Sequence, residues 1–513
     1  MRYRLPTLAI LIIAFAPTPL VAQNGAHQPN ASQRSYQQAR RVLDDAIEAH
    51  GGLEALRAIK DFTLKEKSRI HARFQSPSAE PPFAAGTSEE TLIVDVDRGL
   101  VFDDVKAVNA GFNGWNRTII KGTEGQTYDM WSKTVTPIVN PSVNNFRGQI
   151  RRLPPFVLLE ALDRAPTLRW LGEDEIGGRK QKVISVIRPD NQQLSLSFDA
   201  QTNLLTRYGY LYADPVTGDS EIAQSYSGYR TVGKLKLPSG RVLYNSGGII
   251  QEADYTDLQI NTKPAESVFA GPENFEKLEA PPATPPPPAV SKVADDVYLL
   301  QGLAGGTHNV LFVAFNDHIL VLEAPEQILY NANSVQALTK IKETVPGKPI
   351  KYLVLTHHHS DHAGGFREYV AEGATIVTTA NTKTFLEKAV AESSLLPKSS
   401  KQSKLTIETI QNKKRVFQDD KHVVEIYDIG PNPHANEILV AYLPKEKILF
   451  QADLLNAAPN GTIPIAQDST ISFSERIQQL GLQVEKIYGV HGRAATPEEL
   501  RTAIEKRRAS DLK

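Results

Sequence analysis

The sequence of 513 residues contains no cysteine. Disulfide bonds, cysteine-ligated zinc, thiol nucleophiles and an acylated N-terminal cysteine are therefore excluded. An excess of charge of one sign is also absent, because 57 lysines and arginines face 58 aspartates and glutamates, for a net charge of -1. This balance gives no general attraction to nucleic acid or to anionic membranes. With 41% apolar and 22% charged residues, most of the chain is expected to be globular.

The N-terminus has the parts of a secretory signal. Arg2 and Arg4 precede a short apolar run over residues 8–16, and the small residue Ala22 follows soon after. A basic start, a short apolar core and a small residue at the end are typical of a signal peptide. A membrane anchor is the alternative, but the run is shorter than the ~20 residues that a span needs. We therefore predict a signal peptide over residues 1–22, export to a bacterial periplasm, and no membrane span in the processed protein.

A proline-rich segment divides the rest of the chain. Six of the eight residues from 281 to 288 are proline, a composition that favours an extended, semi-rigid spacer. We predict a linker over residues 276–291, with an accessory domain over 23–275 and a second domain over 292–513.

The first of these domains is predicted to be mostly β with a helix at its start. Apolar residues at helical spacing predict a helix over residues 35–58, and the alternating segments 62–67 and 193–198 predict half-buried strands. The closing segment, residues 229–269, resembles the last strands of periplasmic lipoprotein-carrier half-barrels. That resemblance implies an open curved sheet with an apolar concave side, on which a lipid or other apolar ligand would bind; a structural or docking role is the alternative.

The second domain is predicted to alternate strands and helices, which indicates helices packed on sheets. The predicted strands are residues 297–300, 310–315, 318–322, 350–355, 438–442, 447–450 and 486–490, and the predicted helices are residues 327–344 and 497–506.

Histidines mark the chemistry of this domain. Nine of the twelve histidines lie between His308 and His491, and the densest group directly follows a predicted strand. In an extended segment His357 and His359 share one side, whereas His358 points to the other. Imidazoles next to a carboxylate suit zinc and other first-row transition metals, so the segment predicts a metal site.

The pattern His357-x-His359-x-Asp361-His362 resembles the signature of the metallo-β-lactamase-fold superfamily. Three further positions of that family's ligand set are matched in order, by His434 in a loop before a strand, and by Asp453 and His491 at strand ends. The resemblance covers residues 292–513 and implies an αββα sandwich with a binuclear site at one edge.

The resemblance also implies how the ligands divide between two divalent ions, for which zinc is the expected identity. One ion would be held by His357, His359 and His434, and the other by Asp361, His362 and His491. Asp453 would bridge both, together with a water or hydroxide that attacks a carbonyl. Asp361 and Asp453 are therefore the expected catalytic residues.

The substrate class follows from comparison with subfamilies. Residues 430–450 resemble the zinc β-lactamases that use a cysteine ligand, but Asp453 stands at the cysteine position and Asn456 where many have a lysine. A bridging aspartate resembles the glyoxalase-type thioesterases, lactonases and nuclease relatives, although residues 435–437 replace their Thr-Pro-Gly. In the resembling fold, the loop that contains His308 and Asn309 borders the site, so these residues and Asn456 are expected to contact substrate.

We therefore predict an exported binuclear hydrolase of a small-molecule ester, lactone, thioester or amide, with no nucleic-acid partner. Three alternatives stay open at this point. They are a zinc β-lactamase acting on β-lactams, a mononuclear iron persulfide oxygenase, and a non-catalytic binding module of the same fold.

Overall fold

The computed structural model describes residues 28–510, apart from 72–73, 84, 110–111, 140–147, 215, 217, 281, 327–332 and 393–403. The predicted signal peptide, residues 1–22, lies outside the described residues. Among the helices that are described, none is both long and apolar enough to span a membrane.

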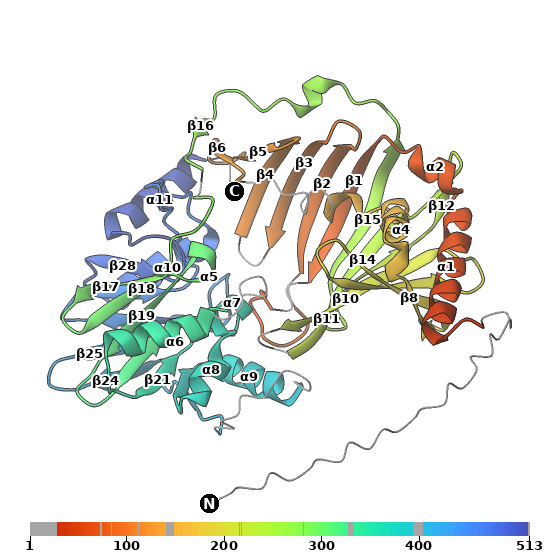
Figure 1. Ribbon diagram of the computed structural model, residues 1–513. Helices are drawn as coiled ribbons and strands as arrows, with labels where there is room; N and C mark the ends of the chain where they lie inside the picture. The colour runs from red at the N-terminus through yellow and green to blue at the C-terminus, as the bar shows by residue number, and fades with distance from the viewer. Residues whose placement is uncertain are drawn as a thin grey trace, which may run out of the picture.

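The N-terminal part is built on one long, curved sheet (Figure 1). Its fourteen strands follow the order β16-β6-β5-β4-β3-β2-β1-β15-β14-β11-β10-β9-β8-β7, and neighbours run antiparallel except for β16 and β6. The strands are β1 (Asp61–His71), β2 (Ala85–Asp95), β3 (Leu100–Asn109), β4 (Phe112–Lys121), β5 (Glu124–Asp129), β6 (Thr134–Pro137), β7 (Arg169–Ile176), β8 (Arg179–Ile187), β9 (Gln193–Asp199), β10 (Leu205–Asp214), β11 (Gly218–Ser227), β14 (Gly240–Asn245), β15 (Gly248–Ile260) and β16 (Glu276–Lys277). A separate hairpin pairs β12 (Arg230–Val232) with β13 (Leu235–Leu237).

Helices α1 (Ala31–Ala49), α2 (Leu53–Arg57) and α4 (Pro154–Asp163) pack against this sheet and enclose an apolar core. This confirms the prediction of a mostly β region that begins with a helix. The prediction of one continuous helix over residues 35–58 is wrong, because the chain turns at Gly51 with φ +120°. A β-carbon at Gly51 would lie 2.4 Å from the carbonyl oxygen of Lys234, so the turn requires glycine.

The C-terminal part is a sandwich of two sheets between two layers of helices. Residues from both sheets form a shared apolar core, and further apolar clusters join each outer face to its helices. The first sheet contains β17 (Ala289–Ala294), β18 (Val297–Gly302), β19 (His308–Ala314), β20 (Ile319–Leu322), β21 (Ile350–Val354), β22 (Thr375–Thr378) and β23 (Ile407–Thr409). The second contains β24 (Lys414–Gln418), β25 (Val423–Asp428), β26 (Leu439–Leu443), β27 (Ile448–Gln451) and β28 (Lys486–Gly489).

The helices of this part are α5 (Leu303–Gly306), α6 (Asn333–Thr344), α7 (Ser360–Ala363), α8 (Phe366–Ala371), α9 (Ala380–Glu392), α10 (Asp468–Gln479) and α11 (Pro497–Ala509). The predicted αββα arrangement is thereby confirmed. Of the predicted helix 327–344, residues 327–332 lie outside the described part. Within the predicted linker, residues 276–277 belong to β16 and β17 begins at residue 289, and the domain boundaries themselves stay a prediction.

Three hairpin ends of the N-terminal sheet reach the C-terminal part (Figure 1). Between β1 and β2, the carbonyl oxygen of Pro77 accepts a 2.8 Å hydrogen bond from the amide of Asn436. At the start of β4, the ring of Phe112 contacts that of His434, and after β10 the carbonyl of Val216 accepts a bond from Arg367. Antiparallel pairing places these connections at one end of the sheet, which is therefore the end that meets the predicted site.

A buried ion network links the strands that carry these hairpins. On β1, Glu66 is almost fully buried, and its carboxylate lies 2.7 Å from Arg241 Nη2 and 3.3 Å from Arg152 Nη1. Burial raises the pKa of Glu66, but the two arginines outweigh burial and lower it. The carboxylate is therefore ionised. It neutralises the positive charge of the two arginines, which would otherwise be buried without a partner.

We predict that Glu66→Gln lowers the free energy of unfolding by about 3 kcal/mol, because it leaves buried arginine charge uncompensated. This loss is at the low end of the range for breaking a buried ion pair, because Arg152 keeps its 2.7 Å contact with Glu90 in the variant. Urea unfolding followed by tryptophan fluorescence measures the change, because all three tryptophans lie before residue 171. The control is Glu89→Gln, which breaks an exposed pair with Lys67 and should leave the transition unchanged. Equal shifts in the two variants would contradict the prediction.

Candidate metal centre

The candidate ligands come from the ends of strands in both sheets. After β21 the chain enters the loop that carries His357 and His359, and the short helix α7 then carries Asp361 and His362. The other three come from the second sheet, where His434 precedes β26, Asp453 follows β27, and His491 follows β28. Because strand ends meet along one edge of the sandwich, packing of the two sheets brings the seven side chains together.

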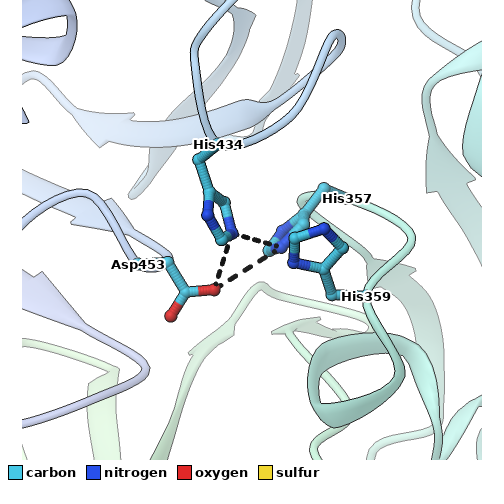
Figure 2. Close-up of side chains that lie close together, drawn as sticks. All are labelled: His357, His359, His434 and Asp453. Carbon is cyan, nitrogen blue, oxygen red and sulfur yellow. Dashed lines mark hydrogen bonds and ion pairs between the residues drawn. The ribbon is translucent and has the colours of Figure 1, made fainter. Parts of the chain in front are cut away.

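A first group joins His357, His359, His434 and Asp453, whose candidate ligand atoms all lie within 4.8 Å of one another. Figure 2 shows these side chains turned toward one another. His434 Nε2 lies 3.1 Å from His357 Nε2 and 3.0 Å from Asp453 Oδ2. All four residues are buried, so this group is shielded from bulk water.

A second group joins Asp361, His362, His491 and again Asp453. His362 Nε2 lies 2.7 Å from Asp453 Oδ2, and His491 Nε2 lies 3.0 Å from Asp453 Oδ1. The side chains of Asp361 and His491 are about one-fifth exposed, at 19% and 20%. Solvent therefore reaches the second group, and Asp453 is the residue that the two groups share.

The hydrogen-bond state of the imidazole nitrogens in the first group fits a bound metal ion. His359 Nδ1 is buried and has no hydrogen-bond partner among the described residues. The Nε2 atoms of His357 and His434 face each other at 3.1 Å, where at least one of them must carry a proton if nothing else binds. A buried imidazole nitrogen without a suitable hydrogen-bond partner destabilises the fold. A cation that takes nitrogen and oxygen ligands would satisfy these nitrogens together.

Partners outside the groups fix which ring nitrogen faces inward. His362 Nδ1 lies 2.8 Å from Glu323 Oε2, and His357 Nδ1 lies 2.9 Å from Thr356 Oγ1. Glu323 is fully buried, and its other oxygen accepts a 2.6 Å bond from the amide of Thr356. On the open side, His491 Nδ1 lies 3.2 Å from the carbonyl oxygen of Thr307. Such contacts orient a metal-binding imidazole and increase its basicity.

Electrostatics favour a cation between these side chains. Burial raises the pKa of Asp453, but the charge of His362 and hydrogen bonds from the imidazoles outweigh burial and hold the pKa well below its usual range. Burial, together with neighbouring imidazoles, lowers the pKa of His357 and His359 well below the usual range. Both histidines are therefore neutral, which is the form that binds a metal.

His362 and His491 differ from these two because carboxylates surround them. Burial lowers the pKa of His362, but Asp453 and Asp361 raise it well above its usual range. Burial likewise opposes charge on His491, whose bonds to the same two aspartates raise its pKa to about 9. The second group therefore attracts positive charge, which a proton supplies when no cation is bound.

The other predicted site residues occupy different positions. His358 is buried but belongs to neither group of candidate ligands. His308 lies edge-on against His491, with ring centroids 4.3 Å apart. The side-chain amide of Asn309 donates to the carbonyl oxygens of Gly489 and Gly492, and so supports the loop that carries His491. Asn456 is exposed. A substrate contact of His308, Asn309 or Asn456 stays a prediction.

Sequence reasoning missed several residues that touch the candidate ligands, among them Glu323, Gln75, Ser76 and Phe112. Glu323 follows strand β20, which pairs with β21, so its place at a strand end was a usable signal. Gln75, Ser76 and Phe112 come from the N-terminal part, about 280 or more positions away from the ligands that Gln75 and Ser76 contact. No local pattern marks residues whose role depends on the packing of two distant segments.

Two sheets packed face to face, with helices outside and strand ends that bring histidines and aspartates together, define an αββα domain with a candidate metal site. The sequence model described as the Metallo-beta-lactamase superfamily matches residues 333–491, so this segment of the chain is similar to that superfamily. The predicted family resemblance is thereby confirmed. This similarity supports a metal-dependent hydrolase as the class of protein.

The solved structures that resemble the chain include metallo-beta-lactamases from three organisms. The enzyme from Pontibacter korlensis has 22% identity and a TM-score of 0.34, over 43% of this chain and 99% of its own. FIM-1 from Pseudomonas aeruginosa has 19% identity and a TM-score of 0.35, over 44% and 97%. The enzyme from Hirschia baltica has 17% identity and a TM-score of 0.33, over 43% and 98%. A search of the curated proteins finds no match.

We predict that Glu323→Gln weakens metal binding by roughly 10- to 100-fold, the usual loss when a residue that orients a ligand is changed. The amide can still accept from Thr356, but it presents no carboxylate to the N–H of His362. Competition between the protein and a chromophoric chelator measures the affinity. Glu326→Gln is the control, because that side chain accepts from Asn333 and Ser334 and should leave the affinity unchanged. Unchanged affinity in Glu323→Gln would contradict the prediction.

Proposed function

We propose that the C-terminal part is a hydrolase that uses two divalent metal ions, with zinc the expected identity. The substrate would be a small-molecule ester, lactone, thioester or amide. The observation that carries the proposal is the pair of candidate ligand groups that share Asp453. A site for a single ion needs one such group, and a carboxylate shared by two groups can bridge two adjacent cations.

In this proposal, His357, His359 and His434 hold the first ion, and Asp361, His362 and His491 hold the second. When bound, two dications would supply an activated water near neutral pH and polarisation of the substrate carbonyl. The chain's own contribution is orientation, because Asp453 bridges the groups and Asp361 presents its carboxylate at the side open to solvent. The buried imidazoles of the first group keep competing water away.

The proposal predicts about two zinc ions per chain in the purified protein, measured by elemental analysis. His434→Ala should remove metal and, with it, turnover of a panel of aryl esters, lactones, thioesters and a chromogenic cephalosporin. The matched control is His358→Ala, which changes a buried histidine of the same cluster that belongs to neither ligand group. The folded fraction of His358→Ala should contain as much metal per chain as the wild-type protein.

Each other outcome points to a different class. One iron per chain would replace the hydrolase with the oxygenase, and a protein that takes up no metal even when it is supplied would indicate a binding module. Hydrolysis of the cephalosporin alone would identify a β-lactamase. Full turnover in His434→Ala would contradict the proposed mechanism.

A further inference from the structure

The hairpin between β1 and β2 contacts both of the loops that carry the histidines of the first group. Next to His359, the amide of Ser360 donates a 3.2 Å hydrogen bond to the carbonyl oxygen of Phe74. Two residues after His434, the amide of Asn436 donates to the carbonyl oxygen of Pro77 at 2.8 Å. Residues 74–77 therefore connect the two loops, although they belong to the N-terminal part of the chain.

Between these backbone bonds, the hairpin contacts two ligand side chains directly. Gln75 Nε2 donates to Asp361 Oδ1 at 2.6 Å. The other oxygen, Asp361 Oδ2, faces the second group, at 3.5 Å from His362 Nε2 and 3.6 Å from His491 Nε2. Gln75 thus occupies one carboxylate oxygen and leaves the other directed at the cluster.

The second side-chain contact concerns His359, whose Nε2 lies 2.9 Å from the carbonyl oxygen of Ser76. A carbonyl oxygen only accepts hydrogen bonds, so His359 Nε2 must carry the proton. His359 Nδ1 is then the unprotonated nitrogen, and it is also the buried atom without a hydrogen-bond partner among the described residues. The hairpin therefore selects the tautomer in which Nδ1 can bind a cation.

We propose that residues 74–77 are a component of the metal centre, in which Gln75 is a positioning residue for Asp361 and the Ser76 carbonyl sets the tautomer of His359. The inference rests on the proposed function, since it assumes that the two groups bind metal. It goes beyond that function because it makes the catalytic part depend on the N-terminal part for the geometry of its ligands.

The effect of Gln75 should be confined to the second ion. Asp361 belongs to the second group and not to the first. Its side chain is 19% exposed, so without the amide it can turn toward solvent and lose its alignment. The hairpin itself has other anchors in the C-terminal part, because Ala79 lies in an apolar core there and Phe74 packs on Phe385. Loss of the amide therefore leaves the hairpin in place.

The test replaces Gln75 with methionine, which keeps the length of the side chain and removes the donor. Metal-free protein is titrated with zinc in competition with a chromophoric chelator, so that the two equivalents are resolved. In Gln75→Met the second equivalent should bind roughly 10- to 100-fold more weakly, with the first unchanged. Gln149→Met is the matched control, because Gln149 Nε2 donates at 2.9 Å to Asp103, a carboxylate outside both ligand groups. Gln149→Met should bind both equivalents of zinc with the affinity of the wild-type protein.

The outcomes separate this inference from the proposed function. If the unchanged protein binds no zinc, the proposed function fails. If it binds two equivalents and Gln75→Met does the same with equal affinity, the inference is overturned and the function stands. Equal weakening of both equivalents would also overturn it, because a general loosening is not selective positioning. Should Gln75→Met not fold, as judged by tryptophan fluorescence, Gln75→Ala takes its place with the same expected result.

Discussion

The candidate metal centre depends on one buried carboxylate that is shared by two sets of imidazoles. Asp453 lies within 3.0 Å of His434 on one side and of His362 and His491 on the other. A carboxylate buried alone would be protonated or would destabilise the fold, so the surrounding histidines are needed to keep it charged. The backbone of Asp453 has a left-handed conformation, φ 64°, which turns the chain directly after β27 and is tolerated by aspartate.

This arrangement exists only when the two sheets of the sandwich are packed together. His357, His359, Asp361 and His362 follow the first sheet, whereas His434, Asp453 and His491 belong to the second. The apolar core between the sheets joins residues such as Leu311 and Val354 to Ile426 and Phe450. Because close-packed interiors yield little to strain, this core sets the distances between ligands that share no local segment.

The N-terminal sheet contacts the loops of the sandwich that carry the candidate ligands. Its hairpin ends contact the ligand loops through Gln75, Ser76 and Phe112, all at the end of the sheet where β1 joins β2 and β3 joins β4. The opposite end of the sheet and its helices are held by a core of their own. One end of the N-terminal part therefore belongs to the site, while its resemblance to carrier half-barrels stays a prediction.

The class of the C-terminal fold and the seven residues that meet at its edge could be predicted from the sequence. His357, His359, Asp361 and His362 form a dense local motif, whereas His434, Asp453 and His491 were predicted from the resemblance to the superfamily. The end of the first helix at residue 49 could not be predicted. It depends on the close approach of the Lys234 carbonyl oxygen to Gly51, and these residues are far apart in the chain. The tertiary structure also decided the contacts of Glu323, Gln75 and Ser76, since a hydrogen bond between distant segments leaves no pattern in either one.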